Sequence, residues 1–379
     1  MSPEAPNTCR QVAVAEEPRG WFTWVPTSMK ALLDAERRIL RAVKTAWVGR
    51  YARVGREGSE VWTVSLEKEA KEAATPLVLV HGFAGGVGLW AQNLDALAAT
   101  KRSVHAFDLL GFGRSSRPKF SRDATLVEAE WVQSIEDWRK EMKLDKIILL
   151  GHSLGGFLAS SYAIEHPEHV RHLILVDPWG FPAKPLDMER QIQIPTWVRA
   201  VARIVSVFNP LASLRVAGPY GRAMVKRFRP DLGRRFAAAH PDDPDGETPD
   251  EEAIYDYIYH CNVQTPSGES AFKTLNESFG WAKRPMVERL PKQLAPSVPI
   301  TFLYGSRSWI DSGPGFYVEG QRAGSYVAVE MVEGAGHHVY ADRADLFNAK
   351  VAEVCARVDS GQDVVQPGEP LHHPPLIVS

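Results

Sequence analysis

The chain has 379 residues, of which 44% are hydrophobic, and its formal net charge is −2. This length suits one large α/β domain with insertions or two modest domains, and the near-neutral charge gives no reason to expect a nucleic acid partner. The cysteines Cys9, Cys261 and Cys355 are odd in number and far apart, which excludes a disulfide framework and a cysteine metal site and favours a reducing compartment.

The ends of the chain carry no signal for export or for membrane insertion. The N-terminus lacks an apolar stretch of signal-peptide length, and no segment approaches the roughly 18 apolar residues of a membrane span. We therefore expect a cytoplasmic protein that is soluble or peripherally attached to membranes. Residues 1–19 are polar and residues 360–379 are rich in proline, so both segments are expected to be disordered.

The segment 20–50 begins with an aromatic cluster that suits a lipid surface. Trp21, Phe22 and Trp24 lie within four positions of one another, and indole rings favour the headgroup level of a bilayer. These residues predict an anchor to a membrane or a lipid droplet.

The rest of this segment reads as a basic amphipathic helix. Thr27 or Ser28 can cap it, and apolar residues recur behind them at helical spacing. Six Lys or Arg accompany two Asp or Glu between residues 26 and 50, which attracts a helix to anionic lipid. The alternative is a helix that packs on the body of the protein with its aromatic residues buried.

Strand-like and helical patterns then alternate along the chain. This order predicts an α/β architecture, with a mostly parallel sheet and helices on both faces. Its core is expected in residues 51–178 and 299–359. The strands are expected at 61–66, 77–80, 104–107, 147–150, 173–176, 300–304 and 326–331. The clearest helices are expected at 126–142, 156–166 and 344–358.

The alternation breaks between residues 179 and 298. This stretch contains many prolines, helical apolar runs such as 197–208 and an acidic, proline-rich loop at 241–250. More than a hundred residues inserted between two strands of a sheet are expected to form a lid or cap. Within this insertion the basic string 226–229 can meet a phosphate headgroup or form a solvated face.

Residues 147–156 read Ile-Ile-Leu-Leu-Gly-His-Ser-Leu-Gly-Gly and predict a nucleophile elbow. The apolar run is typical of a strand covered on both faces, and the residues that follow suit a helix. Gly151 and Gly155 are expected to leave room for a turn too tight for Cβ atoms beside Ser153. Ser153 is therefore the candidate nucleophile.

A serine nucleophile needs a base and a group that orients the base, and in this architecture they follow in the order Ser, Asp or Glu, His. The base is expected in the Gly-rich loop after the last strand, where we favour His337 over the adjacent His338. For the acid we favour Asp311, in the loop after strand 300–304. Asp177 is the rival, with a turn or cap before Pro178 as its other explanation.

Acyl transfer also requires donors for the developing oxyanion. The backbone N–H of Leu154, next after the nucleophile, is expected to be one donor. The N–H of Phe83, in the Gly-rich loop after strand 77–80, is expected to be the second. His81 is interpreted as a prop for that loop, and Asp108 and Arg114 as scaffolding of a neighbouring loop.

Several strings without a generic role in this fold resemble the subfamily of α/β-hydrolase-domain-containing proteins 4 and 5, over residues 20–359. These strings occupy residues 81–83, 107–118, 177–182, 215–219, 257–262, 278–281 and 337–342. The resemblance implies a lipase of N-acylphosphatidylethanolamine and its lyso form for the member 4 branch, and a lipase co-activator on lipid droplets for the member 5 branch. Vertebrate member 5 carries Asn at the nucleophile position, so Ser153 matches the catalytic branch.

The resemblance also implies Ser153, Asp311 and His337 as the triad, and it adds an acyltransferase-type string from His337 to Asp342. For Asp342 we favour a role in capping a helix or holding the loop. The expected function is thus a serine esterase of glycerophospholipids, acting on phospholipid or lysophospholipid. The alternatives are a lysophosphatidate acyltransferase and a non-catalytic regulator of another lipase on lipid droplets, and the partners expected at a droplet are another lipase or a droplet coat protein. No metal or organic cofactor is implied.

Overall fold

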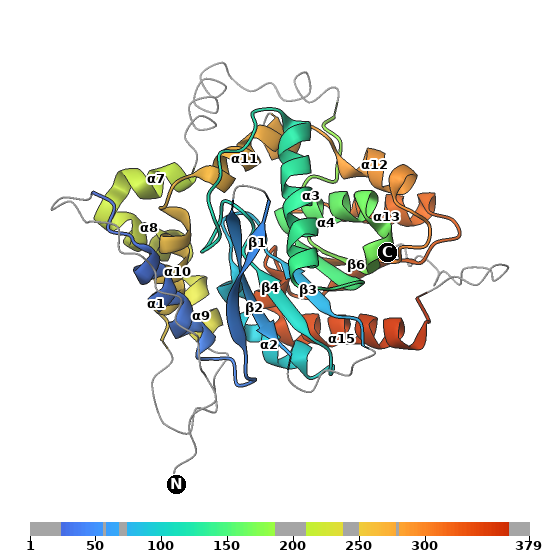
Figure 1. Ribbon diagram of the computed structural model, residues 1–379, viewed down its shortest axis with the longest axis horizontal. Helices are drawn as coiled ribbons and strands as arrows, with labels where there is room; N and C mark the ends of the chain where they lie inside the picture. The colour runs from blue at the N-terminus through green and yellow to red at the C-terminus, as the bar shows by residue number, and fades with distance from the viewer. Residues whose placement is uncertain are drawn as a thin grey trace, which may run out of the picture.

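The computed structural model describes residues 24–55, 58–67, 74–185, 210–237, 250–277 and 280–363. Within them an eight-stranded sheet forms the centre of the molecule (Figure 1). Its strands in spatial order are β1 (Val48–Val54), β2 (Ser59–Leu66), β4 (Val104–Phe107), β3 (Leu77–Val80), β5 (Ile147–His152), β6 (Val170–Val176), β9 (Ile300–Gly305) and β10 (Val327–Val332). β1 and β2 pair antiparallel with their neighbours, and the pairings from β4 to β10 are parallel.

The expected fold class is confirmed, and each predicted strand overlaps a strand of this sheet. β1 is the strand that the sequence did not predict, and it begins inside the segment expected to be an anchor. Its side chains alternate between exposed and buried along an edge of the sheet, whereas every residue of β3, β5 and β9 is buried. Fully covered strands give the continuous apolar runs that sequence analysis detects.

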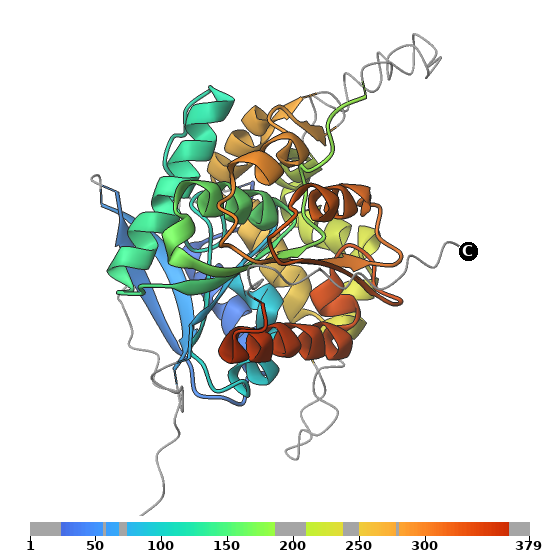
Figure 2. The ribbon, with the colours of Figure 1, turned by 90° about the vertical axis from the view of Figure 1, so that its right-hand side faces the viewer.

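Helices cover both faces of the sheet (Figure 2). Leu77 and Leu79 of β3 belong to the core shared with α2 (Ala91–Ala98) and α15 (Ala344–Ser360). Val78 and Val80 point to the opposite face and belong to the core shared with the helices on that side. Those helices are α3 (Ala124–Glu141), α4 (Leu154–Glu165), α12 (Met286–Gln293) and α13 (Gly313–Gln321).

A group of short helices lies between β6 and β9 in the chain, where a lid or cap was expected, and we refer to this group as the cap. These are α7 (Pro210–Ala217), α8 (Gly221–Phe228), α9 (Asp231–Ala237), α10 (Ala253–Asn262) and α11 (Ser267–Leu275), followed by the small strands β7 (Asn276–Glu277) and β8 (Trp281–Ala282). The run expected at 197–208 lies outside the described residues, as do residues 1–19. The remaining short helices are η1 (Val87–Trp90), η2 (Pro167–His169), η3 (Gly218–Tyr220) and α14 (Val339–Asp342).

The predicted amphipathic helix is α1 (Met29–Leu40), and it packs on the cap rather than facing outward. The Ser28 hydroxyl caps it by accepting a hydrogen bond from the N–H of Ala31. Leu32, Ile39 and Leu40 are buried in the core that α1 shares with α10, and α1 lies beside α10 (Figure 1). Its apolar face is therefore covered by other helices, which is the alternative weighed for this segment, and attachment of residues 20–50 to a lipid surface stays a prediction.

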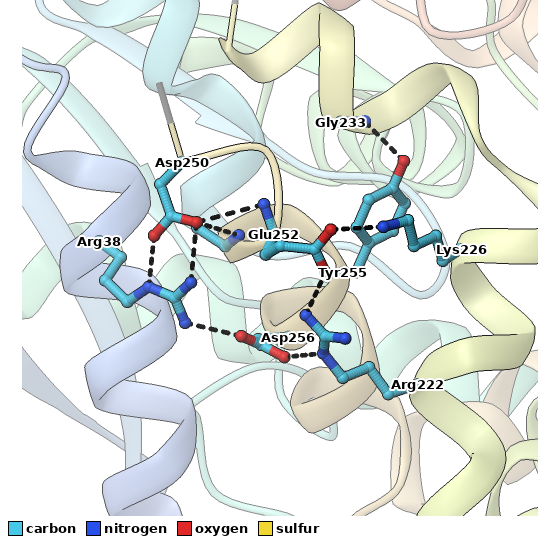
Figure 3. A network of polar contacts seen from close by, with 9 residues as sticks. Arg38, Arg222, Lys226, Gly233, Asp250, Glu252, Tyr255 and Asp256 are labelled. Atoms are coloured by element: carbon cyan, nitrogen blue, oxygen red, sulfur yellow. Dashed lines mark hydrogen bonds and ion pairs between the residues drawn. The ribbon is translucent and has the colours of Figure 1, made fainter. Parts of the chain in front are cut away.

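The basic side of α1 also makes intramolecular contacts. Figure 3 shows Arg38 between two acidic residues, one before α10 and one within it. The ion pairs of this network join Arg38 to Asp250 and Asp256, Arg222 to Asp256 and Glu252, and Lys226 to Glu252. Three helices, α1, α8 and α10, are thus tied together by charge.

A buried ion pair fixes α1 to the sheet domain. The side chain of Glu36 is only 1% exposed and lies 2.7 Å from Nη1 of Arg114. The guanidinium of Arg114 stacks 3.4 Å over the ring of Trp62. The backbone N–H of Arg114 donates a hydrogen bond to the carboxylate of Asp108. Each charge offsets part of the free-energy cost of removing the other from water.

Of the aromatic residues expected to form the anchor, Trp21 and Phe22 lie outside the described residues. Trp24 is 61% exposed, and its indole N–H donates to the carbonyl of Val216 in α7. Across the described ranges, no helix has both the length and the apolar character that a bilayer crossing requires.

The described structure extends a few residues into the C-terminal segment that was expected to be disordered. Asp363 falls in the segment predicted to be disordered, yet its carboxylate is buried and accepts hydrogen bonds from Arg171 and from the ring of His172. The two described cysteines, Cys261 and Cys355, are buried and unpaired with each other.

We predict that Glu36→Ala lowers the free energy of unfolding by about 3–5 kcal/mol, because it leaves Arg114 buried without a counter-charge. Urea denaturation at neutral pH measures this loss. Asp34→Ala, at an exposed position of the same helix, serves as the control and should change stability by less than about 0.5 kcal/mol. Equal effects of the two substitutions would contradict a structural role for the buried pair.

Candidate active site

Ser153 lies on the predicted turn between β5 and α4, and its backbone is strained. Its φ of 52° and ψ of −117° are unusual for a residue with a side chain. A Cβ on Gly151 would lie 2.3 Å from the carbonyl oxygen of Gly155, and a Cβ on Gly155 would lie 2.4 Å from that of Val80. The elbow therefore requires glycine at both positions, as the sequence predicted.

His337 joins Ser153 to a carboxylate. Its Nε2 lies 3.1 Å from the Ser153 hydroxyl oxygen, and its Nδ1 lies 2.8 Å from an oxygen of Asp177. Because Nδ1 donates its proton to the carboxylate, Nε2 is the acceptor that faces the hydroxyl. The arrangement can draw the proton from a serine as it attacks a carbonyl carbon.

The carboxylate in this contact is Asp177, and the preference for Asp311 was wrong on this point. Asp177 directly follows β6 with a φ of 44° and is fully buried. It also accepts hydrogen bonds from the N–H of Gly305 and from the hydroxyl of Ser308. Asp311 is exposed, and its carboxylate accepts the N–H of Gly313 at the start of α13.

The reason lies in how two loops cross at the carboxyl end of β9. A Cβ on Gly305 would lie 2.4 Å from the carbonyl oxygen of Gly336 and 2.6 Å from that of Ala335. The loop after β10 thus passes directly over the end of β9 and carries His337 to the neighbouring β6. The loop after β9 leads instead into α13, and Asp311 goes with it.

Two further histidines flank His337, and both are neutral. The ring of His152 lies inside the elbow, and its Nε2 donates to the carbonyl of His337 at 2.9 Å. Burial lowers the pKa of His152 well below its usual value, and His337 lowers it further. Burial also lowers the pKa of His338 to about 3. His338 is a neighbour of the base, as expected, with its ring centroid 5.5 Å from that of His337.

The segments that carry the two expected oxyanion donors are both close to Ser153. Leu154 is the first residue of α4, and the first N–H groups of a helix have no partner within it. A Cβ on Gly82 would lie 3.0 Å from Cβ of Ser153, so the backbone that leads into Phe83 runs against the nucleophile. The backbone of Gly82 thus lies beside the nucleophile, and the roles of the Leu154 and Phe83 N–H groups as oxyanion donors stay predictions.

His81 props the loop that carries Phe83. Its Nδ1 donates to the carbonyl of Gly82 at 2.7 Å, and its Nε2 accepts the N–H of Leu109 at 2.9 Å. Burial lowers the pKa of His81 to about 4, so the ring is neutral at pH 7. The ring therefore ties the loop after β3 to the loop after β4.

Asp342 does not contact the ring of His337, whose two nitrogens face Asp177 and Ser153. One oxygen of Asp342 accepts the N–H of Gly336 at 2.7 Å, and the other contacts Arg235 of α9. The His337 to Asp342 string thus forms a loop clamp, which is the role we favoured.

Sequence reasoning missed two residues at this site. Ser308 donates to Asp177, and the indole of Trp309 lies 4.9 Å from the ring of His337, measured between ring centroids. Trp309 is 71% exposed, so it presents apolar surface beside the base. The available signal for Trp309 was an aromatic residue shortly after the predicted strand 300–304. Many core residues follow a strand in the same way, so this signal did not single out Trp309.

Comparison with known proteins gives a consistent result. The sequence pattern described as alpha/beta hydrolase fold matches residues 75–344. The chain is 53% identical to the (lyso)-N-acylphosphatidylethanolamine lipase of Mus musculus, over 91% of this chain and 98% of that protein. It is 48% identical to the 1-acylglycerol-3-phosphate O-acyltransferase ABHD5 of Homo sapiens, over 90% of this chain and 96% of that protein.

Solved structures are similar in fold at low sequence identity. A membrane phospholipase A, described as a bacterial virulence factor, has a TM-score of 0.58 at 21% identity, over 87% of this chain and 91% of that one. The carboxylesterase CesB of Bacillus subtilis has a TM-score of 0.57 at 16% identity, over 86% of this chain and 98% of that one.

The geometry predicts opposite outcomes for the two candidate acids. Asp177→Asn should slow the reaction of Ser153 with a fluorophosphonate by roughly 10⁴-fold, because His337 loses the partner that orients it. Asp311→Asn should leave the rate near that of the parent protein. Labelling rates of the two purified variants decide between them, and a large loss in Asp311→Asn alone would restore the first preference.

Proposed function

We propose a reaction for this chain from the premise that it belongs to the α/β-hydrolase fold family, in the group of the (lyso)-N-acylphosphatidylethanolamine lipases and the ABHD5 proteins. It is an enzyme of the hydrolase class. Its substrates in this proposal are the acyl esters of glycerophospholipids, with N-acylphosphatidylethanolamine and its lyso form as the leading class. The observation that carries the proposal is the hydrogen-bonded series Ser153, His337 and Asp177 at the elbow.

The proposed reaction proceeds through an acyl-enzyme. Ser153 attacks the ester carbonyl while its proton passes to Nε2 of His337, and Asp177 remains ionised and holds the imidazolium. The N–H groups of Leu154 and Phe83 stabilise the oxyanion. His337 then gives its proton to the departing glycerol oxygen. Water, deprotonated by His337, attacks the acyl-enzyme and releases a fatty acid and free Ser153.

A second candidate is transfer of the same acyl group to a lysophospholipid hydroxyl. The name of the ABHD5 relatives, 48% identical to this chain, favours it. The acyl-enzyme would be common to both reactions, and only the acceptor differs. Ser153, which is part of the hydrogen-bonded series, argues against the third alternative, a non-catalytic co-activator of another lipase.

Attachment to a membrane or a lipid droplet is proposed from exposed apolar side chains on the cap. Trp24, Val216 and Tyr220 are all exposed. They are neighbours, because the indole of Trp24 donates to the carbonyl of Val216 and a Cβ on Gly218 would lie 2.7 Å from that ring. Exposed aromatic and aliphatic groups of this kind favour a lipid interface. The protein is accordingly proposed to be cytoplasmic and peripheral.

Ser153→Ala is expected to abolish both lipid hydrolysis and labelling by a fluorophosphonate probe. Lipid profiling of the products from a phospholipid panel, with and without a lysophospholipid acceptor, measures hydrolysis and transfer together. Ser270→Ala, at an exposed position of α11, is the control and should retain full activity. Persistent labelling of Ser153→Ala would sink the assignment of the nucleophile.

Trp309→Ala should raise KM for long-chain esters by roughly tenfold, the effect of losing about 1.4 kcal/mol of apolar contact with the acyl chain. Short-chain esters, which do not reach the indole, should be hydrolysed as before. Trp309→Phe keeps an aromatic ring and should retain most of the affinity. Equal losses on long-chain and short-chain esters would show that Trp309 acts on His337 instead of on the substrate.

A further inference from the structure

The corner between α8 and α9 is the most basic part of the described cap. Between Gly221 and Ala237 the chain carries six Lys or Arg and a single acidic residue, Asp231. Two of the six, Arg222 and Lys226, are ion-paired with residues around the start of α10 (Figure 3). Of the other four, Arg229 and Arg235 pair with Asp231 at the start of α9.

Arg229 and Arg235 flank Asp231 in this corner. Nε and Nη2 of Arg229 each lie 3.0 Å from an oxygen of Asp231, and Nε of Arg235 lies 3.4 Å from one of them. The hydrogen bonds from Arg229 lower the pKa of Asp231, so the carboxylate is ionised and holds both guanidinium groups in place. The side chains of Arg229 and Arg235 are 38% and 35% exposed, and Nη1 of Arg229 takes no part in the pair.

This corner lies against the loop that carries the base. Arg235 contacts Asp342, and the other oxygen of Asp342 accepts the N–H of Gly336, the residue before His337. The charges of Arg229 and Arg235 act on His338, where they add to the effect of burial in lowering its pKa. The contact of Arg235 with Asp342 thus places this corner beside the loop that carries His337 and His338.

We propose that Arg229 and Arg235 form a phosphate subsite of the active site, which binds the phosphodiester of a glycerophospholipid while its acyl ester lies at Ser153. This inference rests on the proposed function and assigns the part of the substrate that the series of Ser153, His337 and Asp177 does not contact. Guanidinium groups suit the task because their planar fork matches phosphate oxygens. Asp231 acts as a positioning residue, since it orders both forks before the lipid binds.

The subsite also predicts how a phospholipid is oriented in the active site. The indole of Trp309 offers apolar surface next to His337, whereas the guanidinium groups offer charge next to His338. A phospholipid carries both kinds of group, joined through glycerol at the ester that is cleaved. A neutral monoacylglycerol has the same ester and acyl chain but nothing for the two arginines to bind.

Arg229→Gln is the decisive variant, because Arg229 pairs with Asp231 of the cap whereas Arg235 also contacts the catalytic loop. Its activity is compared on 1-oleoyl-glycerophosphoethanolamine and on 1-oleoylglycerol. We expect KM for the phospholipid to rise by roughly tenfold, which corresponds to about 1.4 kcal/mol, with kcat retained. The values for 1-oleoylglycerol should stay unchanged, and Arg229→Lys should be intermediate on the phospholipid.

Arg227→Gln provides the matched control, since Arg227 is exposed near the end of α8, two residues before Arg229, and lies outside the subsite. It should leave the kinetics of both substrates unchanged. An equal loss on both lipids in Arg229→Gln, or no loss on the phospholipid, would overturn the proposal. Inorganic phosphate distinguishes a headgroup site from a site for free anions. With the parent protein, inorganic phosphate should inhibit hydrolysis of the phospholipid and leave hydrolysis of 1-oleoylglycerol unchanged. A change in the turnover of 1-oleoylglycerol would instead indicate a site for free anions.

The same question can be asked without turnover. In the Ser153→Ala background, calorimetry should show tighter binding of 1-oleoyl-glycerophosphoethanolamine than of 1-oleoylglycerol, and Arg229→Gln should remove that preference. Absence of the preference would reject the subsite whatever reaction the protein performs. Failure of the parent protein to hydrolyse either lipid would instead count against the proposed function, so the two failures are distinguishable.

Discussion

Backbone packed directly on backbone at the carboxyl edge of the sheet is the constraint on which the site depends. Gly151, Gly155 and Gly305 each lie so close to a carbonyl oxygen that a single added carbon would overlap it. At the first two positions the contact allows the turn that exposes Ser153, and at the third it allows one loop to cross another. Proteins tolerate such close approach only at glycine. Serine, histidine and aspartate meet because three positions carry no side chain.

The crossing at Gly305 also explains the layout of the surrounding residues. Asp177 is buried beneath the loop and receives three hydrogen bonds, from a histidine, a hydroxyl and a backbone N–H. His152 holds the same loop from the opposite side through the carbonyl of His337. Asp342 holds its N-terminal part through Gly336. The base is therefore fixed by its backbone as well as by its ring, which is the form of preorganisation that catalysis favours.

The comparison with the sequence analysis separates local from non-local information. The buried strands and the elbow were predictable, because apolar runs and glycine spacing record packing within a few residues. The choice of Asp177 over Asp311 was not, since it depends on which loop passes over which strand, and both aspartates follow a strand in the expected order. Strand β1 was missed because an edge strand alternates and has no continuous apolar run.

The helix α1 illustrates a second limit. Its amphipathic pattern is the same whether the apolar face meets lipid or another helix, and only the partner, α10, settles the matter. Glu36 was a hint, because a carboxylate on the predicted buried face calls for a cation that the local sequence does not supply. Its partner, Arg114, comes from a loop far along the chain.

The attachment of α1 has a consequence for how the enzyme meets its substrate. Arg38 ties this helix to the cap and Glu36 ties it to the sheet domain, and Trp24, five residues before the helix, is hydrogen-bonded to the cap. Trp24 is thus held in a defined position relative to Ser153. An anchor joined by a flexible linker lets a catalytic domain tumble and approach a membrane in many orientations. A lipid contact at Trp24 would instead set the height and tilt of Ser153 above the bilayer. The structure of the protein would then fix how far a lipid must move out of the bilayer to reach Ser153.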